Sequence, residues 1–177
     1  MSHAGPLSLL ASGWQINNVL SFYSGSPFTV TSSANSLLLP GSTQTADQIK
    51  PSVAKTGGAG KGQSFFDPFA FAPVTDARFG TAALNSIRGP GVANSDFGLF
   101  REFAMRERWK LQFRAEAFNL SNTPHFANPG ANRSNLSLNP DGSVRDLGGF
   151  TEITSTINLA RDGIDERQFR VGLRLSF

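Results

Sequence analysis

The chain ends in the stretch FRVGLRLSF, residues 169–177, in which large apolar side chains alternate strictly with polar or small ones. Successive side chains of a β-strand point to opposite faces of the sheet, so this alternation predicts a strand with one apolar face. The apolar positions are Phe169, Val171, Leu173, Leu175 and Phe177. Arg170 and Arg174 fall on the opposite face.

Three further runs show the same period of two. In WKLQFRAEA, residues 109–117, one face carries Trp109, Leu111 and Phe113, and the other carries Lys110, Gln112, Arg114 and Glu116. A run from residue 14 to 30 has in phase Trp14, Ile16, Leu20, Phe22, Phe28 and Val30. A fourth run has in phase Phe97, Leu99, Phe103 and Met105. Arg101 interrupts it, where we expect a bulge or a long side chain that reaches out of the apolar face.

The connections between these runs differ greatly in length. We expect strands near residues 14–31, 94–105, 108–119 and 168–177, so that only Arg106-Glu107-Arg108 joins the second strand to the third. Residues 32–93 and 120–167 would form two long irregular loops, and loops of this length are uncommon in compact soluble domains. Short turns on one side and long loops on the other are typical of outer-membrane β-barrels. In that orientation, Trp14 and Trp109 begin outward strands in the periplasmic aromatic girdle.

Composition supports a β-rich protein outside the cytoplasm. Only 16% of the 177 residues are charged, none of the first 46 is Lys, Arg, Asp or Glu, and there is no cysteine. About a quarter of the residues are charged in an ordinary soluble domain. The lack of cysteine excludes a disulfide scaffold, a zinc finger and a thiol nucleophile. No apolar run is long enough for a transmembrane helix.

Motifs that would indicate catalysis or cofactor binding lack support. The run TGGAGKG, residues 56–62, departs from the phosphate-loop pattern at its first glycine and at its Ser/Thr position, so we expect a flexible loop. The two histidines, His3 and His125, have no nearby carboxylate in sequence, which argues against a metal site. We therefore expect no enzyme activity and no cofactor.

Several segments resemble TonB-dependent outer-membrane receptors of the Oar-like group, which often carry a carboxypeptidase-regulatory-like domain. The similar segments are GWQIN (13–17), SGSPFTV (24–30), FFD (65–67), FAF (69–71), RGPG (88–91), RWKLQFRAEAFNL (108–120) and the final run 169–177. The resemblance covers residues 13–177 and implies a barrel of about 22 strands. This chain would supply the last four, as the C-terminal part of the barrel domain (1–177), with no counterpart of the plug or regulatory domains.

The resemblance also implies roles for the alternating residues. The final run resembles the signal that the barrel-assembly machinery reads. The lipid-facing set would be Trp14, Ile16, Leu20, Phe22, Trp109, Leu111 and Phe113. The lumen-facing set would be Lys110, Gln112, Arg114, Glu116, Arg170 and Arg174. Expected partners are outer-membrane lipid, the assembly machinery, the rest of the barrel with its plug, the TonB complex and a small solute, with no nucleic acid.

The leading interpretation is thus a fragment of a receptor in the bacterial outer membrane, which binds a solute at the cell surface and imports it into the periplasm. Four strands cannot close a barrel, because even the smallest need about eight. Two other interpretations stay open at this point. One is a small outer-membrane or surface β-protein for adhesion or binding, and the other is a secreted soluble β-sandwich that serves as a binding module.

Overall fold

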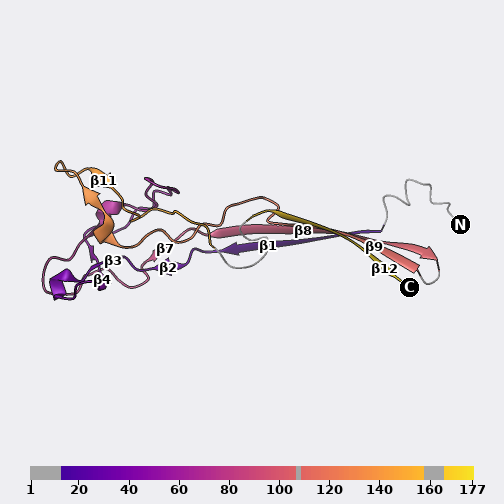
Figure 1. Cartoon of the computed structure of the whole chain (residues 1–177), viewed down its shortest axis with the longest axis horizontal. Coiled ribbons are helices and arrows are strands. Elements are labelled where there is room, and N and C mark those ends of the chain that lie inside the picture. Colours follow the sequence, from indigo (N-terminus) through magenta and orange to yellow (C-terminus); the bar gives the residue numbers. More distant parts are fainter. Residues whose placement is uncertain (1–12, 107–108, 158–165) are drawn as a thin grey trace. The chain divides into compact units, whose positions relative to one another are not determined.

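The structure is a computed structural model that describes residues 13–106, 109–157 and 166–177. The chain divides into two compact units. The first unit contains the four long strands, and the second combines residues 23–92 with residues 125–157. The first unit is built from strands, and the second from short strands and 3-10 turns (Figure 1). Nowhere in the described ranges is a helix both long and apolar enough to span a membrane.

The first unit is one antiparallel sheet. Its strands are β1 (Trp14–Tyr23), β8 (Val92–Arg106), β9 (Trp109–Phe118) and β12 (Gln168–Ser176), in the order β1-β8-β9-β12. Figure 1 shows the four strands as a twisted ribbon of sheet. The expected all-β antiparallel meander is confirmed.

The register of the sheet preserves the alternation of the sequence. Val171 pairs with Ala115, Leu173 with Phe113 and Leu175 with Leu111. On the other side of β9, Leu99 pairs with Ala115 and Phe103 with Leu111. Apolar residues of neighbouring strands therefore lie opposite each other, which is the arrangement that stabilises cross-strand pairs.

The bulge expected at Arg101 is not there. Arg101 pairs directly with Phe113 in an unbroken register, and the only shift along this pair of strands lies between Ala104 and Arg106. The irregularity thus sits beside the connection to β9, whose residues 107 and 108 lie outside the described ranges. Arg101 keeps the phase of its neighbours.

The first strand is shorter than predicted. It ends at Tyr23, and Phe28 and Val30, expected on the apolar face, lie instead in the core of the second unit. A contact between distant residues accompanies this end: a Cβ on Gly25 would lie 1.9 Å from the carbonyl oxygen of Gly89, so the chain makes a close backbone approach where the strand would have continued. Pro27 adds to the break because it has no backbone N–H for a ladder.

Short paired segments make up the second unit. Its strands pair as β2 (Pro27–Phe28) with β7 (Ile87–Arg88), β3 (Thr31–Ser33) with β4 (Thr43–Thr45), β5 (Asp47–Gln48) with β6 (Phe71–Ala72), and β10 (Ser137–Leu138) with β11 (Val144–Asp146). Its 3-10 turns are η1 (Asn35–Leu37), η2 (Pro68–Ala70) and η3 (Arg133–Asn135). Residues 32–92 and 125–157, which are most of the two segments predicted as separate irregular loops, therefore form one unit.

Phenylalanines form the core of this second unit. Phe66 is fully buried, and its ring packs edge-on against Phe71 at 6.1 Å and against Phe150 at 5.5 Å between centroids. Phe28 packs on the same ring at 5.8 Å. Edge-to-face aromatic pairs add about 0.5–1.5 kcal/mol beyond the burial of apolar area. Because Phe150 comes from the second loop and the others from the first, the core joins both loops.

The glycine-rich run 56–62 is tied down rather than flexible. The Gly60 N–H donates to the Ile153 carbonyl at 2.9 Å, and the Gly62 N–H donates to the Glu152 carboxylate. The other oxygen of that carboxylate accepts the Gly149 N–H at 2.9 Å. Glu152 is buried, so these backbone donors replace the water that an exposed carboxylate would bind. The glycine-rich run thus binds the Glu152 carboxylate of its own unit, and not a phosphate.

Glu152→Gln should weaken the second unit locally. One carboxamide NH2 would then face a backbone N–H, which leaves a buried donor unsatisfied and costs about 1–3 kcal/mol. Hydrogen exchange at the Gly62 and Gly149 amides should show opening free energies lower by that amount. Asp76→Asn is the matched control, because Asp76 is exposed and makes one ion pair, to Arg78 at 3.5 Å. Equal exchange in the two variants would contradict this account of Glu152.

Candidate functional site

One face of the four-stranded sheet is apolar. We call it the apolar face, and it carries Trp14, Ile16, Leu20, Phe22, Phe97, Leu99, Phe103, Trp109, Leu111, Phe113, Phe169, Val171, Leu173 and Leu175. The ring of Trp14 meets that of Phe113 edge-on at 6.0 Å, which places β1 in phase with β9. All seven residues predicted as a lipid-facing set thus share one face.

Much of this apolar face is uncovered. Phe22 is 74% exposed, Val171 72% and Leu173 69%, whereas a soluble β-sandwich would bury such residues against a second sheet. Burying one side chain of this size is worth about 1.5–3 kcal/mol. A contiguous exposed patch of this kind marks a surface that contacts another apolar phase or partner.

Aromatic rings lie where β1 and β9 begin. Trp14 starts β1 and Trp109 starts β9, and the Trp109 ring lies 5.5 Å from the ring of Phe177. Phe177 is 90% exposed, so it contributes an aromatic ring to the same rim. Rings at strand ends on an apolar face are the arrangement found in the girdles of membrane barrels.

Arg101 is a charged exception on the apolar face. Its guanidinium lies 4.4 Å from the centroid of Phe103 and 5.1 Å from that of Trp14, and the residue is only 8% exposed. Cation–π contacts of this kind are worth more when the ion is desolvated, up to about 2 kcal/mol. Arg101 is therefore accommodated on the apolar face by the rings of Trp14 and Phe103, and the backbone pairing there is unchanged.

The opposite face, which we call the polar face, carries all six residues predicted to face the lumen. Arg174 pairs with Gln112 and Arg170 with Glu116, while Ser176 pairs with Lys110 and Gly172 with Arg114. Lys110 forms an ion pair with Glu102 at 3.2 Å, and Arg114 lies 4.0 Å from Glu116. These side chains are exposed, apart from the partly buried Glu116, so each pair contributes about 1 kcal/mol or less to stability.

Two phenylalanines on the polar face support its arginines, and the sequence analysis missed both. The Arg114 guanidinium lies 5.0 Å from the ring centroid of Phe100, its direct cross-strand partner, and Arg170 lies 4.9 Å from Phe118. Stacking on a ring holds a guanidinium in place while its N–H groups stay available to solvent. The signal that identifies them is a Phe at a polar position opposite or diagonal to an Arg.

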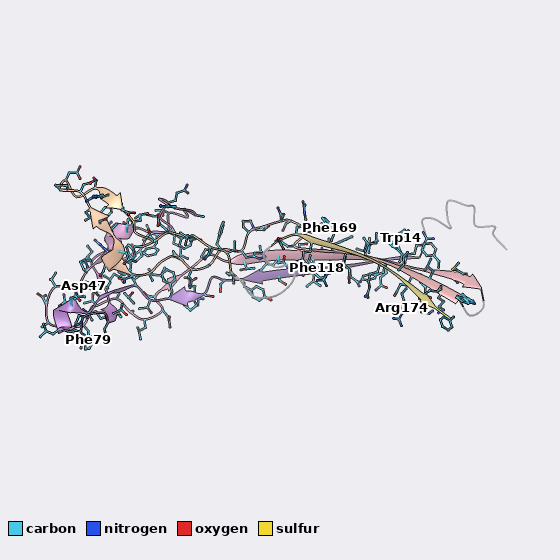
Figure 2. The ribbon with its side chains drawn as sticks, viewed as in Figure 1. Trp14, Asp47, Phe79, Phe118, Phe169 and Arg174 are labelled. Carbon is cyan, nitrogen blue, oxygen red and sulfur yellow. The ribbon has the colours of Figure 1, made fainter. Side chains whose placement is uncertain are left out.

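Gly172 leaves an opening on the polar face. A Cβ built on Gly172 would meet nothing within 4 Å, and its cross-strand partner is Arg114. A hollow of about 220 Å³ lies beside it, lined by Gln112, Arg114 and Arg174 among others. Figure 2 labels Arg174 and Phe169 at well-separated positions along β12. The polar face is therefore a hydrated surface with a basic character at its β9–β12 side.

A hydrogen-bonded turn ends β9. Asn119 has a left-handed backbone with φ of 46°, and its N–H donates to Asp96 at 2.9 Å. Its side chain both donates to the Thr123 carbonyl at 3.1 Å and accepts the Thr123 N–H at 3.0 Å. Asn tolerates this conformation better than most residues, so the turn chemistry matches the sequence. The turn fixes where the chain leaves the sheet.

Asp47 and Asp67 of the second unit are paired with cations, and the buried Arg133 binds a backbone carbonyl. Hydrogen bonds from the Arg78 guanidinium, at 2.7 and 2.8 Å, lower the pKa of Asp47 below its ordinary 3.8. Burial alone would raise the pKa of Asp67, but hydrogen bonds from the Lys50 ammonium and the Phe69 N–H outweigh it and lower that pKa. Burial lowers the pKa of Arg133, whose Nε donates to the Phe71 carbonyl at 2.8 Å.

Metal-ligating residues do not gather in the described parts of the chain. No group of three or more His, Asp or Glu side chains there could hold an ion. His125 is fully buried in the second unit, and His3 lies outside the described residues. The candidate functional features are the two-faced sheet of the first unit and, considered by itself, the packed second unit.

Comparison with known proteins agrees with this geometry. A family model described as "Outer membrane beta barrel domain" matches residues 1–170 of the 177. Neither the curated proteins nor the solved structures contain a chain that matches this one. A one-layer antiparallel sheet with one apolar and one polar face is what that family requires. The chain belongs to the family of outer membrane beta barrel domains, and its location is the bacterial outer membrane.

Proposed function

We propose that this chain is the C-terminal barrel segment of a TonB-dependent receptor of the Oar-like group. Such a receptor binds a solute at the cell surface and imports it into the periplasm with energy that TonB transmits. The observation that carries the proposal is the two-faced sheet, because an exposed apolar face opposite an exposed charged face fits a barrel wall between lipid and water.

In this proposal the apolar face meets lipid and the polar face lines the lumen. Trp14, Trp109 and Phe177 then belong to the periplasmic girdle, and Arg101 lies near it with its charge shielded by Trp14 and Phe103. A basic residue on the lipid face costs about 2–4 kcal/mol at the bilayer midplane and little near the interface. The shielding of Arg101 supports a position close to the interface.

The sheet edges support a larger barrel. Among the described residues, β1 bonds only to β8 and β12 only to β9, so each edge strand has one free side. In lipid an unpaired strand edge costs several kcal/mol for each unsatisfied backbone group. Further strands must therefore pair with both edges, as the resemblance to a barrel of about 22 strands implies.

We further propose that β12 and Phe177 present the signal for barrel assembly. Phe169, Val171, Leu173 and Leu175 alternate on a strand to whose outer edge no other strand of the described ranges is bonded. An assembly factor that adds a strand to this edge would gain affinity from main-chain hydrogen bonds and register from the alternate apolar side chains.

Transport requires no covalent chemistry from this chain. The packed second unit is the part that we assign to the cell surface, where it captures solute together with the plug of the complete receptor. Adhesion is the second candidate function, because a loop unit with its own aromatic core would also suit contact with another surface. Dependence on TonB separates the two.

The two faces can be tested by cysteine labelling, since the chain has no cysteine of its own. Leu173→Cys and Arg174→Cys are matched variants, adjacent on β12 and on opposite faces. In outer membranes the Arg174→Cys thiol should react with a water-soluble maleimide on the order of tenfold faster or more, because the thiolate attacks the maleimide and a thiol in lipid cannot ionise. Equal rates at both positions would exclude the lipid–lumen assignment.

The assembly role can be tested with Phe177→Ala. Removal of this ring should lower the amount of protein in the outer membrane and leave more in the periplasm, because the signal loses its last apolar contact. Phe79→Ala is the control, as Phe79 is an exposed phenylalanine of the second unit. Quantitative immunoblots of the two fractions measure the effect. Normal levels of the Phe177→Ala protein would remove the proposed role.

Import can be tested in cells that produce the complete receptor. Uptake of its solute should stop when TonB is deleted or the proton gradient is collapsed, while binding at the surface should persist. Radiolabelled uptake and binding at 4 °C measure the two separately. Binding without TonB-dependent uptake would favour adhesion and contradict the transport proposal.

A further inference from the structure

The second unit contains a hollow that fits a small molecule. It has a volume of about 430 Å³, within the range of roughly 300–1,000 Å³ that ligand sites occupy. Its lining comes from two parts of the chain, around β5 and around β7: Gln48, Pro51, Ser52, Val53, Lys55, Asn85, Ser86, Ile87 and Arg88. Both parts belong to the same compact unit.

The lining combines cations with neutral hydrogen-bonding groups. Lys55 and Arg88 provide two positive charges, Gln48 and Asn85 provide carboxamides, and Ser52 and Ser86 provide hydroxyls. None of the nine lining residues is acidic. Val53 and the buried Ile87 add an apolar surface. Carboxamides and hydroxyls exchange hydrogen bonds with sugar hydroxyls, and the cations select a ligand with negative charge.

The nearby carboxylates do not cancel this positive charge. Asp47, next to Gln48, forms a two-pronged hydrogen bond with Arg78, which lies outside the lining. Asp67 accepts from Lys50 at 2.5 Å, and Lys50 also lies outside the lining. Each acid is thus neutralised by a cation that the hollow does not use. The charge of Lys55 and Arg88 remains available to a ligand.

The walls are held in place by backbone contacts. The Asn85 N–H donates to Thr29 Oγ1 at 2.8 Å, and the Gln48 N–H donates to Thr81 Oγ1 at 3.0 Å. Lys55 forms a backbone bridge with Phe66 of the aromatic core, and Arg88 pairs with Pro27 while its Nη1 donates to the Gly25 carbonyl at 3.2 Å. A preformed site loses less conformational entropy on binding.

We propose that this hollow binds an acidic saccharide, with the carboxylate of a uronic acid unit at Lys55 and Arg88 and its hydroxyls at the carboxamides and serines. The proposal rests on the assignment of the second unit as the solute-capturing part, and it names the substrate class. A neutral sugar would leave the two cations without a counter-charge, and a simple anion would leave the neutral groups unused.

Calorimetric titration of the full chain in detergent with digalacturonic acid tests the proposal. Saturable binding should weaken about tenfold in Lys55→Gln, which loses a charge-assisted hydrogen bond. Lys61→Gln is the matched control, an exposed lysine of the same unit outside the hollow, and should bind within twofold of the unchanged chain. Ser86→Phe, which fills the hollow, should abolish binding. Higher salt should reduce affinity.

Three results would overturn the proposal. They are the absence of binding, an equal effect of the two lysine variants, and binding of neutral digalactose or inorganic phosphate as tight as that of digalacturonic acid. These outcomes are separable from failure of the proposed function. Labelling on opposite faces of β12 and TonB-dependent uptake of another solute would leave the receptor assignment intact while the saccharide site fails. If the chain bound the saccharide but cysteines on both faces of β12 reacted equally, the saccharide site would stand and the receptor assignment would fail.

Discussion

The backbone hydrogen-bond ladder that joins β8, β9 and β12 is the constraint on which the rest of the structure depends. Once Val171 lies opposite Ala115 and Leu173 opposite Phe113, every second side chain is committed to one face. A shift by a single residue would move each arginine of the polar face to the apolar face. Register thus decides simultaneously which surface meets lipid and which meets water, and the direct Arg101–Phe113 pair shows that even a misplaced charge does not displace it.

The alternation of apolar and polar residues made the faces of the sheet predictable from sequence. It did not show where a strand ends. The faces of β9 and β12 follow directly from residues 109–117 and 169–177, because period two admits one strand geometry. The end of β1 did not follow. Phe28 and Val30 stay in phase with Trp14, and only the close approach of Gly25 to Gly89, a contact across a long stretch of sequence, shows that the strand has already ended.

The second unit was the larger gap in the prediction. Its strands are two or three residues long, too short for any period to emerge, and its core depends on contacts between residues far apart in the chain. The sequence shows that the chain is rich in phenylalanine, but it does not show which of these rings pack together. The polar-face pairs Phe100–Arg114 and Phe118–Arg170 were equally hidden, since each requires knowledge of the register before the two residues become neighbours.

The shared aromatic core restricts how such a surface can diversify. Phe66 is contributed by one long connection and Phe150 by the other, and the two rings pack against each other. A graft that replaced only one connection would expose half of a hydrophobic interior and leave the remaining half without its counterpart. Recombination among relatives should therefore exchange both connections as a pair, one starting near Gly25 and the other near the Asn119 turn, and new specificities would be inherited as whole modules.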